Sequence, residues 1–276
     1  IGHIEEEDFK YLDYAVVPGC LPYRLQSDYD RELRQRSFRT AILENDILRA
    51  TFLLELGGRL WSLVHKPSGR ELLCVNPVFQ PANLAIRNAW FCGGVEWNIG
   101  LRGHSVFTCS PLFAARVAGD EGEPVLRLYE WERIRGVPFQ MDFSLPDGSA
   151  FLFVRGRILN PQADDIPMYW WSNIAVAEDS GSRVVVPAEG AYKFSYDGTV
   201  RQAPIPIING VDSTYPTNAG RSADDFYVLP RGRRPWIASL DRGGRGLVQT
   251  STPELRGRKL FRWGMQQGGR RWQEFL

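Results

Sequence analysis

Val137-Pro138-Phe139-Gln140-Met141-Asp142-Phe143-Ser144-Leu145 places an apolar side chain at every second position. A repeat of two residues is the period of a strand with one buried face, whereas a helix repeats every 3.6 residues. The turn residues Pro146-Asp147-Gly148 follow, and Ala150 to Leu159 supplies a run that can return beside the first. This stretch therefore predicts neighbouring antiparallel strands.

Strand and turn patterns continue on both sides of this stretch. Gly57-Gly58 separates the apolar runs 48–56 and 59–65, and Gly243-Gly244 separates 236–241 from 246–250, so each pair predicts a hairpin. Further strands are expected at 41–44, 71–75, 125–131, 169–177, 183–187, 259–263 and 270–276, the last two joined by a turn at Gly268-Gly269. Residues 33–36 fit one helical turn, and 196–231 fit a long loop.

No helix of ordinary length with capping residues is apparent in this pattern. Many short strands separated by turns favour an all-β fold, a large antiparallel β-sandwich. We expect residues 1–39 to form an irregular lead-in with edge strands, and residues 40–276 to form one sandwich domain.

Composition excludes several classes of function. Hydrophobic and charged fractions of 43% and 24% are ordinary for a globular protein, and a net charge of +1 argues against nucleic acid or an anionic membrane as partner. No apolar run approaches the roughly 18 residues of a membrane span. The four cysteines are far apart and lack zinc-ligand spacing, so we expect no metal site, no cofactor and a reducing, cytoplasmic location. The nine Trp, ten Tyr and fifteen Phe suit stacking on sugars, and carbohydrate is the expected partner.

The candidate site centres on Phe91-Cys92-Gly93-Gly94-Val95-Glu96-Trp97-Asn98-Ile99-Gly100. The adjacent glycines permit unusual backbone conformations or a close approach by another group. A strand over 95–99 would place Glu96 and Asn98 on one face and three apolar side chains on the other. His104 follows this strand, and Arg87, Asn88 and Trp90 precede it. The alternative is a polar strand face turned to solvent.

A series of motifs spread over most of the chain resembles a known family. The motifs are Leu43-Glu44-Asn45, Gly57-Gly58-Arg59-Leu60-Trp61-Ser62, Asn76-Pro77, Gln80-Pro81, Gly93-Gly94-Val95-Glu96-Trp97-Asn98, Asn160-Pro161, Trp170-Trp171-Ser172-Asn173 and Lys259-Leu260-Phe261-Arg262-Trp263-Gly264. They resemble an uncharacterised bacterial domain, often found ahead of tetratricopeptide repeats, in the galactose-mutarotase-like superfamily. The resemblance implies a β-super-sandwich with a concave sugar-binding face, and a tetratricopeptide-repeat region in the full-length protein. It implies no particular reaction.

The sequence departs from that superfamily at two places. Sugar mutarotases carry a catalytic histidine on the strand that in this chain contains Trp170-Trp171-Ser172-Asn173, so His104 would have to replace it. Losing one partner of an acid–base pair costs about 10²–10⁴-fold in rate. The family pattern also continues past Leu276 into a strand with a glutamate, so a further site residue is expected after that position.

These observations give two hypotheses of function. The first is a glycoside hydrolase or sugar epimerase in which Glu96, His104 and Glu130 are catalytic; the alternatives are a salt bridge for Glu96 and an edge-strand charge for Glu130. The second is a non-catalytic sugar-binding or protein-interaction module of a larger repeat protein. The predicted substrate-binding residues, of which each Trp could instead lie in the core, are Arg59, Arg87, Asn88, Trp90, Asn98, Trp171, Asn173 and Trp263.

Overall fold

The computed structural model describes residues 17–30 and 32–275. Strands make up 38% of the chain and helix 5%, in several antiparallel sheets, which confirms the all-β prediction. Contacts divide the chain into two compact units, which we call the N-terminal unit (Tyr11–Val176) and the C-terminal unit (chiefly Ala177–Leu276). Each unit is described by itself below, and the count of one domain over residues 40–276 stays a prediction. Residues 1–16 of the expected lead-in lie outside the described part.

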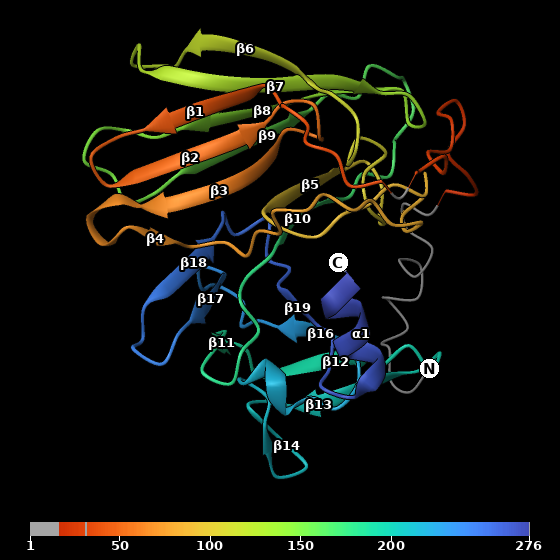
Figure 1. Ribbon diagram of the computed structural model, residues 1–276, viewed down its shortest axis with the longest axis vertical. Coiled ribbons are helices and arrows are strands. Elements are labelled where there is room, and N and C mark those ends of the chain that lie inside the picture. Colours follow the sequence, from red (N-terminus) through yellow and green to blue (C-terminus); the bar gives the residue numbers. More distant parts are fainter. Residues whose placement is uncertain (1–16, 31, 276) are drawn as a thin grey trace. The chain divides into compact units, whose positions relative to one another are not determined.

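Two antiparallel sheets form the N-terminal unit (Figure 1). The first has the order β1-β2-β3-β5-β10, with β4 beside β3; its strands are β1 (Thr40–Glu44), β2 (Leu48–Leu53), β3 (Arg59–His65), β4 (Arg70–Glu71), β5 (Val95–Ile99) and β10 (Trp170–Ile174). The second has the order β6-β7-β8-β9, formed by β6 (Phe113–Ala118), β7 (Pro124–Glu132), β8 (Val137–Ser144) and β9 (Phe153–Ile158).

Aromatic side chains join the two sheets in a shared core. The ring of Phe143 on β8 lies 4.7 Å from that of Phe52 on β2 and 5.1 Å from that of Trp97 on β5. Along β8, Val137, Phe139, Met141 and Phe143 are buried while the residues between them are not. The alternation in the sequence is therefore the alternation of inner and outer positions in this sandwich.

The C-terminal unit contains shorter sheets and the α-helix. Its four-stranded sheet has the order β13-β12-β16-β19, from β12 (Gly190–Phe194), β13 (Val200–Pro204), β16 (Ala223–Val228) and β19 (Lys259–Arg262). A three-stranded sheet contains β11 (Arg183–Val185), β17 (Trp236–Leu240) and β18 (Gly246–Thr250), and β14 (Ile207–Ile208) pairs with β15 (Val211–Asp212). The hairpin predicted around Gly243-Gly244 is confirmed as β17 and β18.

The prediction of a final strand at 270–276 was wrong. Gln267–Phe275 forms the helix α1. Gly269 lies against the carbonyl oxygens of Trp263 and Gly264 so closely that a side chain could not fit, and Trp272 stacks on Trp263 with ring centroids 6.3 Å apart. Gly269, one of the two glycines that predict a turn, therefore permits a close approach by the helix.

Three further local predictions need correction. Residues 196–231 are not one loop but contain β13, β14, β15 and β16; Asn209 and Gly210, both at positive φ, form the hairpin turn between β14 and β15. The predicted strand at 71–75 is reduced to β4, and no helical turn forms at 33–36. Within the described residues, no helix is long and apolar enough to cross a membrane.

Candidate functional site

A row of polar side chains crosses the first sheet on the face turned away from the shared core. Asn173 of β10 is the register partner of Glu96 on β5. On the other side of β5, Leu60 pairs with Val95, so the antiparallel register places Arg59 opposite Glu96. Trp97 points into the core, which by strand alternation puts Glu96 and Asn98 on the opposite face, as predicted.

The paired glycines before β5 explain why this strand comes so close to β3. Gly94 has a φ of 66°, and a Cβ atom placed on it would lie 2.4 Å from the carbonyl oxygen of Leu60. A side chain at position 94 would force the strands apart. The close approach that the glycine pair predicted is therefore what brings Arg59 and Glu96 together.

Four donors surround the buried carboxylate of Glu96, which is only 2% exposed. Thr108 Oγ1 donates to Oε1 at 2.6 Å. His104 Nδ1, at 2.8 Å, and Trp90 Nε1, at 3.1 Å, both donate to Oε2, and Asn173 Nδ2 reaches the same oxygen at 3.4 Å. Both oxygens are thus occupied within the protein.

Charge and hydrogen bonding keep Glu96 ionised. Burial by itself raises the pKa of Glu96, but the charge that His104 carries when protonated, its hydrogen bond, the charge of Arg59 and the Thr108 hydrogen bond together hold that pKa well below its usual range. A carboxylate with so low a pKa is a weak base, and its two oxygens have no room for a substrate hydroxyl. Glu96 is better suited to orient His104 than to act on a ligand itself.

The side chain of His104 reaches solvent, and Asn173 is also partly exposed. Its imidazole ring lies between two indoles, with centroids 5.4 Å from Trp90 and 5.0 Å from Trp171, and its side chain is 31% exposed. Because a carboxylate only accepts, Nδ1 carries the proton that is donated to Glu96, and Nε2 is left as the other polar atom of the ring. A carboxylate that fixes the tautomer of a histidine in this way prepares it for proton transfer or directed hydrogen bonding.

The loop after β5 carries His104 and Thr108, and several side chains hold it in place. Asn98 Oδ1 accepts from the Ser105 amide at 2.6 Å. Arg87 donates to the carbonyl oxygen of Val106 at 2.7 Å and to Ser110 Oγ at 3.0 Å. Asn98 and Arg87, predicted as substrate-binding, therefore support the loop. Thr108 was missed because nothing in its sequence neighbourhood distinguishes it from an ordinary loop residue.

The chain is similar to a known protein family and to solved structures. The family described as "Domain of unknown function (DUF5107)" matches residues 15–276. The chain belongs to the DUF5107 family.

Two solved structures resemble this DUF5107 chain. A TPR-domain containing protein from Parabacteroides distasonis has a TM-score of 0.75 and 22% sequence identity, with 95% of this chain and 44% of that protein covered. The Slr1438 protein from Synechocystis has a TM-score of 0.54 and 16% identity, with 84% and 88% covered. At these identities the likeness concerns the fold. This chain spans less than half the length of the Parabacteroides protein.

Other predicted substrate-binding residues of the DUF5107 chain are buried or take part in hydrogen bonds that fix the backbone. Arg59, 2% exposed, donates from Nη1 to the carbonyl oxygens of Phe91 and Gly93 at 3.0 and 2.9 Å, so it fixes the segment that leads into β5. Trp90 is buried beside Glu96. Asn88 adopts a positive φ of 55°, and its carbonyl oxygen accepts from the Tyr29 hydroxyl at 2.7 Å.

Two predicted site residues form their contacts away from Glu96. Glu130 on β7 accepts from the Trp131 amide at 2.7 Å and lies 3.5 Å from Arg133, so local partners occupy its carboxylate. Trp263 belongs to the C-terminal unit, where it stacks on Trp272. The contacts around Glu96 therefore assemble His104, Trp171 and Asn173, but neither Glu130 nor Trp263.

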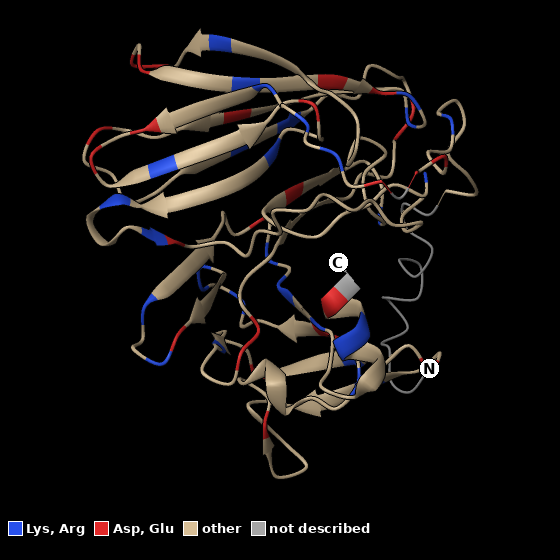
Figure 2. Cartoon of the chain, viewed as in Figure 1, with Lys and Arg blue, Asp and Glu red and all other residues tan. Residues whose placement is uncertain are grey.

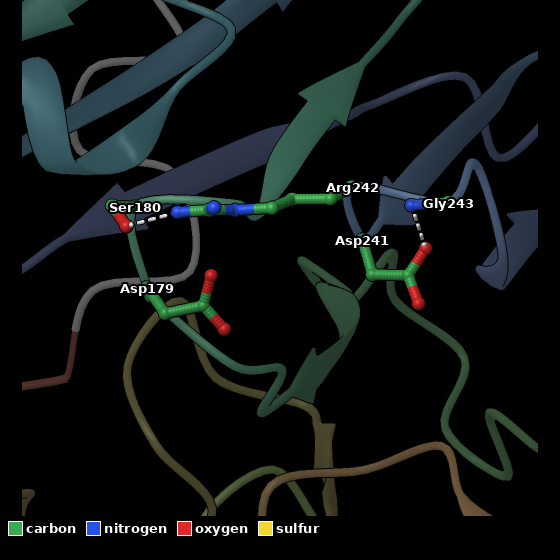
Figure 3. A pocket seen from close by; sticks show the side chains of 5 residues that line it. All are labelled: Asp179, Ser180, Asp241, Arg242 and Gly243. Atoms are coloured by element: carbon green, nitrogen blue, oxygen red, sulfur yellow. Dashed lines mark hydrogen bonds between the residues drawn. The ribbon is translucent and has the colours of Figure 1, made fainter.

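Figure 3 shows a surface pocket of about 430 Å³ in the C-terminal unit. The Asp179 carboxylate accepts from the Gly181 amide, and that of Asp241 from the Gly243 amide, so both carboxylates shape turns. None of the predicted site residues is among its lining residues, which are Asp179, Ser180, Asp241, Arg242 and Gly243. In the part of the chain that the structure describes, no group of three His, Cys, Asp or Glu residues could hold a metal ion.

Proposed function

We propose that this chain binds carbohydrate on the exposed side of the cluster, at His104, Trp171 and Asn173. The observation that supports this most strongly is the imidazole held by Glu96 between two indole rings. Indole faces stack on the C–H faces of sugar rings, while an oriented imidazole nitrogen and a carboxamide form hydrogen bonds with hydroxyl groups.

We also propose that the fold is the galactose-mutarotase-like super-sandwich, with its sugar-binding face on the side of β5 and β10 opposite the core. The two stacked antiparallel sheets and the polar row across the first sheet support this. The Parabacteroides structure supports a further proposal, that the full-length protein carries tetratricopeptide repeats, since it is a TPR-domain containing protein. The cytoplasm is our proposed location, in keeping with four free cysteines.

A second candidate function is sugar epimerisation of the mutarotase type. It is favoured by the Glu96–His104 pair, because a histidine with a fixed tautomer can move a proton to or from a sugar oxygen through Nε2. Hydrolysis by two carboxylates receives less support, because Glu96 is saturated and Glu130 is occupied by Trp131 and Arg133.

A glycan array combined with polarimetry on free aldoses tests both functions. Binding without turnover supports a binding module, and catalysed mutarotation supports the epimerase. The informative variants are Trp171→Ala and His104→Gln, with Trp131→Ala as the matched control because Trp131 is exposed on the other sheet. Loss of binding in the first two variants alone is expected; equal behaviour of all three would contradict the proposed site.

A further inference from the structure

The strand β9 ends the second sheet of the N-terminal unit and has a neighbouring strand on one side only. The amide of Leu159 donates to the carbonyl oxygen of Pro138 on β8, which fixes the direction of the backbone groups along this strand pair. Because these groups alternate in an antiparallel ladder, every second residue back from Leu159 also faces β8. The N–H and C=O groups of the residues between them therefore point away from the sheet, at Val154, Gly156 and Ile158.

This free edge is exposed to solvent and partly apolar. All residues of β9 except Ile158 are exposed. Large apolar side chains are exposed on the strand and directly beside it, at Phe151, Phe153, Val154 and Leu159. A strand edge of this kind, with unpaired backbone groups, is a template for pairing with another strand. In β-strand addition such an edge receives an extended peptide, which main-chain hydrogen bonds hold in place.

Two arginines determine which kind of strand fits beside β9. Arg155 and Arg157 lie on the same face of the strand. Arg155 lies 3.7 Å from Asp120, but both side chains are largely exposed, so this ion pair is weak. Arg157 forms no ion pair with any residue that the structure describes. Antiparallel pairing with β9 of a second copy, centred on Gly156, would place arginine opposite arginine, whereas acidic side chains at these positions would be complementary.

The other face of β9 is apolar. Val154, Gly156 and Ile158 lie on this face, opposite buried side chains of β8. The ring of Trp170 lies against Gly156, since a Cβ atom placed on that glycine would be 3.3 Å from it. A strand added beside β9 therefore meets apolar groups on one face and arginines on the other.

We propose that the free edge of β9 binds an extended peptide segment of a partner protein in which acidic and apolar side chains alternate. The peptide adds a strand to the second sheet and forms hydrogen bonds with the backbone of Val154, Gly156 and Ile158. Its acidic side chains face the two arginines, and its apolar side chains lie on the side of Trp170. This surface belongs to the N-terminal unit and does not depend on carbohydrate binding at His104.

Binding of a short labelled peptide that alternates glutamate and valine tests this proposal in the wild-type chain. Fluorescence anisotropy at low salt should show saturable binding, and a peptide with lysine in place of glutamate should bind at least about tenfold more weakly. Amide hydrogen exchange followed by NMR gives a second measurement. The amides of Val154, Gly156 and Ile158 should exchange fast in the free chain and slowly in the complex, whereas those of Arg155 and Arg157 should be slow in both.

Two variants locate the binding edge. Val154→Pro removes an outward N–H and no hydrogen bond of the sheet, which a strand edge tolerates, and Arg157→Glu reverses an exposed charge. Each should weaken binding of the glutamate peptide at least about tenfold. Ala118→Pro is the matched control and should leave binding unchanged, because the Ala118 amide points away from the sheet at its opposite edge, on β6.

Several results would overturn the proposal. They are a lack of saturable binding by the wild-type chain, equal affinity for the glutamate and lysine peptides, and exchange at Val154, Gly156 and Ile158 that the peptide does not change. Sedimentation showing that the wild-type chain associates with itself, and that Val154→Pro abolishes this association, would identify a second copy as the occupant instead. The measurements on the wild-type chain hold even if a variant fails to fold.

Discussion

Replacing Glu96 by glutamine removes one negative charge and leaves the side-chain shape almost unchanged. The amide oxygen can still accept from His104 and Trp90, and the amide nitrogen can donate to the Thr108 hydroxyl, which also contacts the carbonyl oxygen of Ser105. The loss of stability should therefore come from weaker hydrogen bonds and from the missing charge opposite Arg59, and not from a change in side-chain packing.

The expected decrease in the free energy of unfolding follows from these contacts. Hydrogen bonds to a charged group contribute about 1.5–3 kcal/mol and neutral ones about 0.5–1.5 kcal/mol, so weakening two or three of them and leaving buried Arg59 without its neighbouring charge should lower the free energy of unfolding by about 2–4 kcal/mol. Urea denaturation followed by circular dichroism measures this difference.

The difference in stability between the wild-type chain and the Glu96→Gln variant should depend on pH. Because the pKa of Glu96 is lowered in the folded protein, the unfolded state binds the proton first as the pH falls. The stabilisation is complete above the ordinary pKa of glutamate, about 4.3, and is lost as the pH falls through the lower folded value. The wild-type chain and the Glu96→Gln variant should therefore become more alike in stability as the pH is lowered below about 4.

Glu130→Gln is the matched control. Its carboxylate is 14% exposed, accepts from a backbone amide and lies 3.5 Å from Arg133, so the change should cost less than about 1 kcal/mol. Equal stability losses in the two variants, or a loss at Glu96 that does not change with pH, would refute the reasoning about the buried carboxylate.

Three further predictions, two on substitutions and one on cysteine labelling, test the contacts described above. Gly94→Ala should destabilise the chain by at least about 2 kcal/mol in urea denaturation, because of the positive φ and the contact with Leu60; an unchanged midpoint would show that β3 and β5 can separate freely. Thr108→Val should cost about 1–3 kcal/mol by leaving Glu96 Oε1 without its donor, whereas Thr108→Ser should restore most of it; equal losses in both would point to packing of the methyl group. Burial raises the pKa of Cys109 to about 12, so iodoacetamide at pH 8 should alkylate exposed Cys74 and spare Cys109 in the native protein, as read by peptide mass spectrometry; equal labelling would contradict this.

The sequence predicted those parts of the fold that depend on local alternation. The buried positions of β8 follow directly from the pattern 137–145, and the hairpin around Gly57-Gly58 forms as β2 and β3. The helix α1 was missed because a pair of glycines can mark either a turn or a close contact, and only the packing of Gly269 against Trp263 and Gly264 distinguishes the two. The β14–β15 hairpin was missed although Asn209-Gly210 is a strong turn sequence, because its strands have two residues each.

The candidate site was predictable where it follows strand geometry. Glu96 and Asn98 share a face, as the strand alternation predicts, whereas the pairing of β5 with β10 that places Asn173 beside Glu96 is not visible in local sequence. The roles of the side chains were harder to predict, because they depend on burial: Arg59 and Trp90 lie near Glu96 but are buried, so neither is open to a substrate. Charge patterning gave no further help, since acidic and basic residues are interspersed along the strands of the N-terminal unit (Figure 2).

The affinity of the strongest glycan-array ligand for wild-type chain and for Trp171→Ala tests the carbohydrate site most directly. Isothermal titration should show binding by the wild-type chain, a loss of about tenfold or more, or 1.4 kcal/mol, in Trp171→Ala, and an unchanged affinity in Trp131→Ala. A wild-type chain that binds no glycan, or a Trp171→Ala variant that binds as tightly as the wild type, would contradict the account.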